Sequence, residues 1–373
     1  MCGASEPRPA GHPQRRPYES LQSGRGLFQE ERFPVKRQLL KAGCFVKPPL
    51  RRFDFDAHAL RGTDFYGSIL RYRTEMLKRH RGRIQSPEEY RCLLCHGREG
   101  SPLIEWEAGY QVIQCARCDF STANIAIENA EEHVAQTYTT ELYNQTFQED
   151  YLAQFEYRKS QMGAERYHYL IERLDLDPKA TRVLDVGCGS GTVLAALQDR
   201  GVKCRGLDVN PGAVAFCRSI GLDVAQGELA DEPDAYYDVI TMFDVIEHLA
   251  DPVAVLGTAV QKLKPGRYFV AFTPNIHSVS YELMGNAQNT LLPFEHIGFF
   301  SPKAFEYAAA QIGATVHTLD VFGLDVMDYL LMKEHEDGHP YTARLREMTS
   351  WLQACVDRLS LGNHYRVTLR KGR

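Results

Sequence analysis

Residues 183–191 read Val-Leu-Asp-Val-Gly-Cys-Gly-Ser-Gly, and this stretch decides the fold of the chain. Its apolar beginning is typical of a buried strand, and a helix-like segment follows the last glycine. Glycines let a chain turn tightly and let a ligand approach the backbone without an intervening Cβ. The amides at the start of the next helix are then free for polar ligand groups. The stretch therefore predicts a strand, a ligand-binding turn and a helix in succession.

Strand-like and helix-like segments alternate over residues 181–373, the region that begins with this stretch. Such alternation predicts a parallel, doubly wound α/β sheet. The last strand has charged neighbours, which favours an edge position in the sheet. We expect strands at Arg182–Val186, Lys203–Val209, Leu222–Ala225, Tyr237–Phe243, Tyr268–Thr273, Thr315–Val321 and Tyr365–Leu369, and helices at Thr192–Arg200, Pro211–Ile220, Pro252–Leu263, Pro302–Gly313 and Ala343–Leu359.

Two acidic residues accompany the glycines at positions that suit a ribose-containing ligand. Asp185 precedes the glycines, and Asp208 follows it by 23 positions at the end of the next strand. A carboxylate there can accept hydrogen bonds from both ribose hydroxyls. Dinucleotide-binding loops prefer Gly-x-Gly-x-x-Gly, and this loop is one residue shorter, which disfavours a dinucleotide.

With these residues the chain resembles the class I S-adenosylmethionine-dependent methyltransferases. The resemblance covers residues 181–373 and returns in order at Tyr237-Asp-Val-Ile-Thr-Met-Phe-Asp-Val-Ile-Glu-His248, Leu263-Lys-Pro-Gly266 and Phe272-Thr-Pro-Asn275. It implies a seven-stranded Rossmann-like sheet that binds S-adenosylmethionine. By this resemblance Gly187, Gly189 and Gly191 approach the methionine part of the cofactor, Asp185 supports the loop, Asp208 holds the ribose, Glu228 and Leu229 lie near the adenine, and Phe243 and Asp244 border the sulfonium.

Two pairs of cysteines precede this region, Cys92-x2-Cys95 and Cys115-x2-Cys118, with 19 residues between the pairs. Four thiolates at this spacing suit one tetrahedral zinc ion, and Leu103–Ile113 can supply a hairpin. A closed four-cysteine site is structural and leaves no vacancy for His96. A redox role lacks the expected βαβ context, and a ribbon that has lost its metal is the other alternative. We therefore expect a zinc ribbon over residues 84–130.

A zinc ribbon before such a domain resembles two groups of methyltransferases. One group modifies sugars, polyketides and other specialised metabolites, and the other modifies bases of ribosomal RNA. This chain ends with the last strand of the core, whereas the sugar C-methyltransferases carry a further C-terminal α/β domain. It reads Phe243-Asp-Val-Ile-Glu-His248 where base-modifying enzymes often carry Asn/Asp-Pro-Pro-Tyr/Phe. Methylation of a base amino group is therefore disfavoured.

Two histidines are candidates for catalysis, His248 and His296. We expect both in loops at the carboxyl ends of strands, where open α/β sheets place their sites. A neutral imidazole can take the proton of an acceptor hydroxyl during in-line methyl transfer. Alternatively, Asp244, Glu247 and His248, with His296, resemble the ligands of metal-dependent O-methyltransferases that use a divalent ion. A third interpretation is that Glu247 and His248 only stabilise the end of the strand and the following helix.

Residues 1–83 are basic, with 18 Lys and Arg against 8 Asp and Glu, and the rest of the chain has a net charge of −15. This partly disordered region either attracts an anionic substrate or packs as an arm on its own acidic body. It contains one expected helix, Ser68–Lys78. We expect residues 131–180 to form a helical lid or linker. As a lid, Tyr138, Tyr143, Tyr151 and Tyr157 would cover the cofactor and shape the acceptor pocket, and Arg158 would meet the cofactor carboxylate; alternatively, this helical segment only packs on the core.

The composition is that of a globular protein, with 44% hydrophobic and 24% charged residues. No run approaches the roughly 18 apolar residues of a membrane span, and the N-terminus lacks a signal-peptide pattern. Ten cysteines are too sparse for a disulfide scaffold, so a cytoplasmic protein is expected. The sequence predicts a methyltransferase acting on a hydroxyl, less readily a carbon, of a small metabolite or sugar conjugate. An RNA methyltransferase docking through the ribbon and basic region, and a non-catalytic adaptor, are the alternatives.

Overall fold

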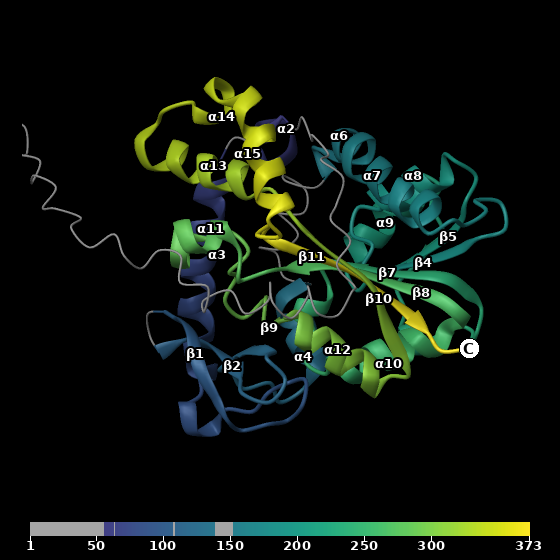
Figure 1. Ribbon diagram of the computed structural model, residues 1–373, viewed down its shortest axis with the longest axis horizontal. Coiled ribbons are helices and arrows are strands. Elements are labelled where there is room, and N and C mark those ends of the chain that lie inside the picture. The colour runs from purple at the N-terminus through teal and green to yellow at the C-terminus, as the bar shows by residue number, and fades with distance from the viewer. Residues whose placement is uncertain (1–55, 63, 107–108, 139–151) are drawn as a thin grey trace, which may run out of the picture.

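The computed structural model describes residues 56–62, 64–106, 109–138 and 152–373. Two β-sheets organise these residues (Figure 1), a larger one in the C-terminal half and a smaller one around the paired cysteines. None of the helices within the described ranges is long and apolar enough to cross a membrane.

The larger sheet has seven strands and confirms the predicted α/β architecture. Six strands run in the same direction, and the last strand in the sequence, β11, runs antiparallel to both of its neighbours. From edge to edge the order is β10 (Ala314–Phe322), β11 (His364–Lys371), β8 (Leu263–Pro274), β7 (Tyr237–Phe243), β4 (Arg182–Val186), β5 (Lys203–Leu207) and β6 (Val224–Ala225).

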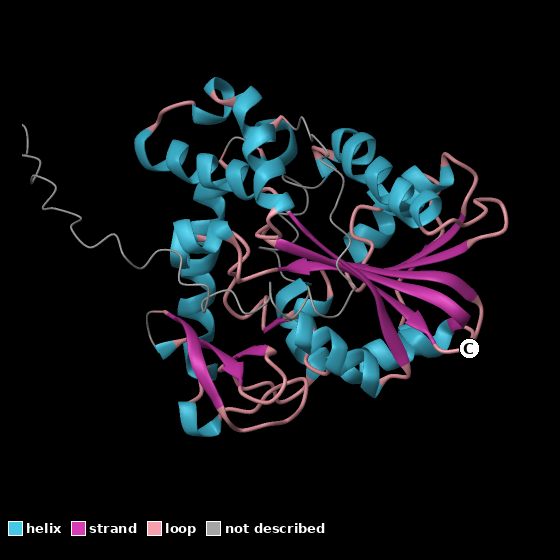
Figure 2. Cartoon of the chain, in the orientation of Figure 1, coloured by secondary structure: helices cyan, strands magenta, loops and turns pink. Residues whose placement is uncertain are grey.

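Helices cover both faces of this sheet (Figure 2). On one face lie α6 (Phe155–Arg158), α7 (Ala164–Tyr167), α8 (Thr192–Gln198) and α9 (Pro211–Ser219), and on the other α10 (Pro252–Lys262) and α12 (Pro302–Gln311). Proline occupies the first position of α9, α10 and α12, where its missing N–H costs nothing. The side chains just before them, of Asn210, Asp251 and Ser301, each accept a hydrogen bond from a first-turn amide. These local signals explain why the helix starts were predictable.

The last strand was expected at an edge, and that prediction is wrong. β11 lies between β10 and β8, and Tyr365, Val367 and Leu369 are fully buried in it. The charge that suggested an edge is compensated inside the protein, because Arg366 Nη1 donates to a carboxylate oxygen of Glu165 at 2.6 Å. A paired guanidinium can remain in a core where a solitary one could not.

The smaller sheet joins two distant parts of the chain. β1 (Gly100–Glu105) and β2 (Gln111–Cys115) form the hairpin predicted between the cysteine pairs, and β3 (Ser121–Ala123) follows. The fourth strand, β9 (Gly298–Phe299), comes from the methyltransferase-like half and was not predicted. A Cβ on Gly298 would lie 2.5 Å from the Phe120 ring, so glycine allows the two segments to approach.

Helices from both ends of the chain gather at the carboxyl ends of the parallel strands of the large sheet (Figure 1). α3 (Phe65–His80) confirms and extends the helix expected at Ser68–Lys78, and α2 (Ala57–Arg61) precedes it. Buried Arg73 of α3 donates to the carbonyl oxygens of Asn286 and Gln288. Within the described residues the basic N-terminal region therefore packs in part on its own body. Two helices here were not predicted, α11 (Val279–Met284) and α13 (Asp325–Asp337), whereas α14 (Tyr341–Arg344) and α15 (Arg346–Arg358) overlap the expected helix.

Candidate functional site

The glycine loop after β4 has the conformation that its sequence requires. Gly187, Gly189 and Gly191 all have positive φ angles, of 71°, 53° and 73°. A Cβ on Gly187 would lie 2.5 Å from a methyl group of Val245, whereas a Cβ on Gly189 would meet no atom within 4 Å. The backbone at Gly189 is therefore open to a ligand, as expected for a loop that a cofactor approaches closely.

Asp208 holds this loop, and a second carboxylate, Asp185, lies just before it. Asp208, after β5, accepts hydrogen bonds from the backbone amides of Gly189 at 2.7 Å and Asn210 at 2.8 Å. Asp185, at the end of β4, is buried and accepts a hydrogen bond from the Thr241 hydroxyl at 2.6 Å. Burial raises the pKa of Asp185 to about 7. Both side chains thus lie where they can fix the glycine loop.

The other residues expected near the cofactor follow the next strands. Phe243 ends β7 beneath the guanidinium of Arg166, which lies 4.8 Å from the ring centroid. Asp244 has a φ of 55° and a half-exposed side chain. Glu228 is exposed and Leu229 is partly buried, directly after β6. The structure therefore places them all in segments that follow strands of the parallel part of the sheet, and their roles remain predictions.

A cavity of about 330 Å³ lies beside Asp244, between the large sheet and the N-terminal helices α2 and α3. Much of its wall is apolar or aromatic, with Leu60, Phe65, Ile69, Met162, Phe272 and Phe322. Its polar lining includes Tyr138, Asp244, His248, Glu295, His296 and His364. Such a cavity suits a small acceptor with a large apolar part and a few polar groups.

The two candidate histidines meet at this cavity, with ring centroids 4.7 Å apart. His248 Nδ1 lies 2.8 Å from the carbonyl oxygen of Glu295 and 2.5 Å from the Tyr138 hydroxyl. Its Nε2 lies 3.1 Å from the carbonyl oxygen of Asp244. Burial lowers the pKa of His248 to about 4, so its ring is neutral at physiological pH.

His296 is held in one tautomer. Its Nδ1 lies 2.6 Å from the carbonyl oxygen of Thr290, which can only accept, so Nδ1 carries the proton and Nε2 keeps a lone pair. Burial holds the pKa of His296 well below its usual range. The next residue, Ile297, donates to the carbonyl oxygen of Glu247 and accepts from the amide of Ala123, both at 2.9 Å. The histidine is thus tied to the loop after β7 and to the smaller sheet.

Glu247, His248 and His296 form a possible metal site. Their donor atoms lie within 4.8 Å of one another. Glu247 is fully buried; its Oε2 accepts from the Thr273 hydroxyl at 2.9 Å, and its Oε1 finds no hydrogen-bond partner among the described residues. Asp244, the fourth ligand considered, is not in this group, and its carboxylate lies 3.8 Å from Nε2 of His364. The donor set fits a divalent ion through three residues rather than four.

The four paired cysteines also converge. Cys92 and Cys118 have their sulfurs 3.6 Å apart, Cys95 and Cys115 have theirs 3.5 Å apart, and all four lie within 4.8 Å. These separations fit a tetrahedron of thiolates about 2.3 Å from one zinc ion. All four side chains are buried, and His96 is not in the group. The residues present therefore fit a closed structural zinc site.

The expected helical lid contributes some of its residues to the site. Tyr138, at the end of α4 (Ala130–Tyr138), and Arg158 line the cavity, and Arg158 also donates to the carbonyl oxygen of Leu60 at 3.0 Å. Tyr157 instead accepts a hydrogen bond from the amide of Asp56 at 2.7 Å and packs on α2. Two further tyrosines, Tyr143 and Tyr151, lie outside the described residues.

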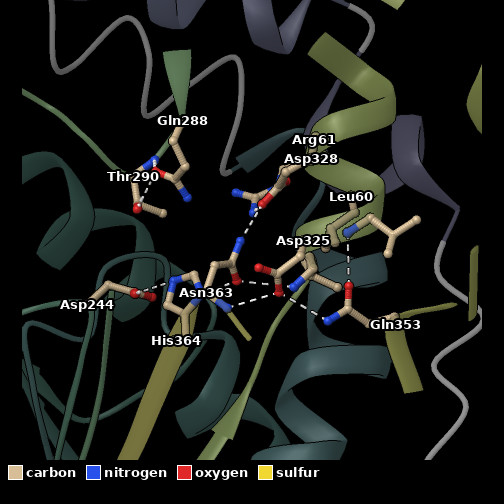
Figure 3. Close-up of polar contacts among 12 residues, drawn as sticks. Leu60, Arg61, Asp244, Gln288, Thr290, Asp325, Asp328, Gln353, Asn363 and His364 are labelled. Atoms are coloured by element: carbon tan, nitrogen blue, oxygen red, sulfur yellow. Dashed lines mark hydrogen bonds and ion pairs between the residues drawn. The ribbon is translucent and has the colours of Figure 1, made fainter. Parts of the chain in front are cut away.

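Two residues that line the cavity, His364 and Arg61, were not predicted from the sequence. Figure 3 shows both of them among the buried polar residues around Asn363. His364 stacks on Phe272, with centroids 4.4 Å apart and planes 4° apart. Arg61 Nη2 lies 3.5 Å from Asp328 of α13. Neither stands in a motif, and only the position of His364 at the start of a core strand could have indicated a site residue.

Comparisons with known proteins show to which family part of the chain is similar. Residues 155–319 match a family described as a methyltransferase domain. A ubiquinone biosynthesis O-methyltransferase of Pseudomonas entomophila is 31% identical over 174 residues, which is 44% of this chain and 72% of the relative. One of Marinobacter nauticus is 32% identical over 127 residues, or 31% of this chain and 52% of the relative. This chain therefore spans about half the length of the Marinobacter relative.

Solved structures show similar folds at low identity. A S-adenosylmethionine-dependent methyltransferase from Archaeoglobus fulgidus is 21% identical with a TM-score of 0.41, covering 60% of this chain and all of that one. The plantazolicin methyltransferase is 14% identical with a TM-score of 0.45, covering 65% of this chain and 96% of that one. The sequence relatives carry the assignment to a family.

Proposed function

The chain belongs to the class I S-adenosylmethionine-dependent methyltransferases, and from this premise we propose that it methylates a hydroxyl group of a small, largely apolar acceptor. One observation carries the proposal. His296 is a neutral histidine with a lone pair on Nε2, and it lines a cavity at the carboxyl ends of the parallel strands, the side of the sheet on which the glycine loop also lies. A hydroxyl nucleophile reacts faster when such a base takes its proton. Methylation of a carbon, the less favoured alternative, does not need a base beside a hydroxyl oxygen.

Residues around the glycine loop would bind the cofactor. When bound, S-adenosylmethionine supplies a methyl group on a positively charged sulfur. The open backbone at Gly189 gives the methionine part close access, and Asp208 would accept hydrogen bonds from the ribose hydroxyls. Phe243 and Asp244 would border the sulfonium, and Asp244 also lines the cavity, while Leu229 and Glu228 would flank the adenine.

His296 would act on the acceptor. Its Nδ1–H is held by the carbonyl oxygen of Thr290, so Nε2 is the atom that takes the hydroxyl proton as the oxygen becomes methylated. The low pKa keeps the ring neutral and ready to accept a proton, although it also makes His296 a weak base. Alignment of oxygen and methyl group by the cavity wall would supply the remainder of the acceleration.

A divalent metal is the second candidate for activating the acceptor. Glu247 Oε1, which has no hydrogen-bond partner among the described residues, and one nitrogen each of His248 and His296 offer three ligand atoms. An ion held there would lower the pKa of a hydroxyl that binds it. Chelation separates the two proposals, because only the metal-dependent enzyme loses activity with a chelator that spares the four-cysteine site.

The cavity favours an apolar acceptor over a sugar or a nucleic acid. Its wall is rich in aromatic and aliphatic side chains, and the relatives above are named for O-methylation in ubiquinone biosynthesis. Two basic residues of the N-terminal region, Arg61 and Arg73, contact this chain's own carboxylate or carbonyl groups. The four cysteine thiols, which serve as metal ligands in this proposal, also favour a reducing compartment such as the cytoplasm.

Tritium transfer from methyl-labelled S-adenosylmethionine tests the proposal. The protein is incubated with phenol, glucose, a nucleoside diphosphate sugar and transcribed ribosomal RNA in separate reactions, after calorimetry has measured cofactor binding. We expect cofactor binding and label in the phenolic ether. Label in RNA would favour the nucleic-acid enzyme instead, and absence of cofactor binding would favour the non-catalytic adaptor.

A further inference from the structure

His364 lies on the side of the cavity formed by β11, and nothing in the proposed mechanism uses it. Its ring is buried and stacked flat on Phe272, so its orientation is fixed. Figure 3 shows it between Asn363 and Asp244, with the buried polar residues of α13 and α15 behind it. It therefore presents a fixed polar atom to whatever occupies the cavity.

The residues behind His364 decide which ring nitrogen carries the proton. Asn363 Nδ2 donates to Asp328 Oδ2 at 2.9 Å, and Asn363 Oδ1 accepts from the amide of Leu324 at 3.2 Å. These two contacts fix the orientation of the amide, so that its oxygen faces His364 Nδ1 at 2.8 Å. An amide oxygen only accepts, and Nδ1 must therefore be the protonated nitrogen. His364 Nε2 is left with a lone pair.

Further contacts hold Asn363 in this position. Its backbone amide donates to Asp325 Oδ2 at 2.9 Å, and Gln353 Nε2 donates to the same oxygen at 3.1 Å. Gly323 approaches so closely that a Cβ there would collide with the Asn363 side chain. The tautomer of His364 is thus set by a packed network rather than by one adjustable contact.

Nε2 of His364 faces a second acceptor. It lies 3.8 Å from Oδ1 of Asp244, and no hydrogen bond to Nε2 is formed by any described residue. Neither a neutral imidazole lone pair nor a carboxylate oxygen can donate to the other. Two acceptors 3.8 Å apart in the cavity wall leave a place for a donor from outside the chain.

We propose that His364 Nε2 and Asp244 form a subsite that binds a hydrogen-bond-donating group of the acceptor, a hydroxyl in the first instance. This inference rests on the proposed function and adds a recognition element to it. A hydroxyl donates to one of the two acceptors, whereas a methyl ether has no proton to donate. Because the hydroxyl that becomes methylated gives its proton to His296, the subsite selects acceptors that carry a second hydroxyl.

Phenol and anisole, its methyl ether, form a matched pair of probes. Each is titrated by calorimetry into the full chain saturated with S-adenosylhomocysteine, and ring ¹⁵N resonances of labelled histidine are followed in parallel. Loss of a hydrogen bond from a buried acceptor corresponds to roughly 10- to 100-fold in affinity. We expect phenol to bind about that much more tightly than anisole, and only phenol to shift the Nε2 resonance of His364.

His364→Phe retains the stacking on Phe272 and removes both nitrogens. It should reduce the preference for phenol by about tenfold and leave anisole binding unchanged. His364→Gln restores an acceptor near Nε2 and should recover part of the preference. His317→Phe is the control, because His317 lies on neighbouring β10 against Tyr268 and outside the cavity.

An unchanged phenol-to-anisole ratio in His364→Phe overturns the subsite. So does a wild-type His364 resonance that phenol leaves unmoved, a result that needs no variant to fold. The proposed function fails separately, when neither S-adenosylmethionine nor S-adenosylhomocysteine binds the wild-type chain.

Discussion

The two sheets of this molecule are assembled in different ways. In the larger sheet, parallel neighbours β4 and β5 are joined by one short helical crossover, and an apolar core covers both faces. The smaller sheet pairs β3 with β9 in the register Ser121 to Phe299 and Thr122 to Gly298, which are 178 and 176 residues apart in the sequence.

 The segments that meet there are distant in sequence. Beside them lie a cluster of four thiols and an apolar cluster that includes Ile104, Val112 and Phe299. The first sheet is thus built from units that are adjacent in the sequence, whereas the second joins distant segments by one long-range strand pairing beside four cysteines that fit a metal ion.

The largest expected effect breaks the smaller sheet alone. Cys115→Ser removes one of the four thiolate ligands and should abolish binding of one zinc ion per chain. The effect on the smaller sheet should be large, because zinc bound by such sites contributes about 10–16 kcal/mol to folding of the domain that holds it. Residues 90–124 should lose protection from hydrogen exchange while the seven-stranded sheet stays folded. Metal analysis and exchange mass spectrometry measure both, with exposed Cys355→Ser as the control. Unfolding of the whole chain would show that the two sheets are one cooperative unit.

His296→Ala tests whether the segment tied to the smaller sheet carries the chemistry of the larger one. Loss of a general base should lower turnover by about 10²- to 10⁴-fold with cofactor affinity nearly intact. Steady-state rates and calorimetry on the same preparation separate the two. Near-normal turnover in a well-folded variant would remove His296 from the mechanism and leave His248 as the candidate.

Asp208→Ala perturbs only the larger sheet. Loss of an ionised acceptor for the ribose, and of its bond to the Gly189 amide, should weaken cofactor binding by about 1.5–3 kcal/mol. Asp223→Ala is the matched control, since Asp223 lies nearby and pairs with Arg205 at the surface. Equal dissociation constants for the wild type and Asp208→Ala in calorimetry would contradict the assignment.

Gly298→Ala tests the pairing that joins the two regions. The new methyl group would press on the Phe120 ring, and overpacking of this kind costs about 1–3 kcal/mol. Gly257→Ala in α10 is the control, because its nearest contact is 3.8 Å away and alanine should stabilise the helix by roughly 0.5–1 kcal/mol. Thermal unfolding compares the two, and equal melting temperatures would mean that β9 does not depend on close approach.

The smallest expected effect is an absence of titration. Since burial lowers the pKa of His248 to about 4, its ring resonances should stay constant as pH falls from about 8 to about 5.5. Protonation should begin only at lower pH, because the buried imidazolium is not solvated by water. Histidine NMR follows this directly, and a shift centred near pH 6.5 would show that water reaches the ring.

These differences also explain which parts of the structure the sequence could predict. The glycine loop, Asp208 and the helix starts at Pro211, Pro252 and Pro302 are local signals, and each was placed correctly. The convergence of the four cysteines also followed from their spacing. In contrast, β9 has only two residues and exists because a distant strand pairs with it, so no local pattern marks it.

The cavity shows the same limit. His248 and His296 were recognised from motifs and from their expected place at strand ends, and they do meet. Arg61 and His364 reach the cavity only through packing of α2 and β11, which periodicity does not encode. Arg366 of β11 can be buried because it pairs with Glu165. The charged residues of the last strand alone cannot reveal a partner that lies so far away in the sequence.

The placement of α2 and α3 has a consequence for how such an enzyme can diversify. The segment that matches the methyltransferase family, residues 155–319, contains the glycine loop, whereas Leu60, Phe65 and Ile69 of the cavity wall lie outside it. Substitutions in these two helices can reshape the acceptor wall without touching a residue that holds the cofactor. Under the proposed function, the choice of acceptor can therefore change during evolution while methyl-donor binding stays constant.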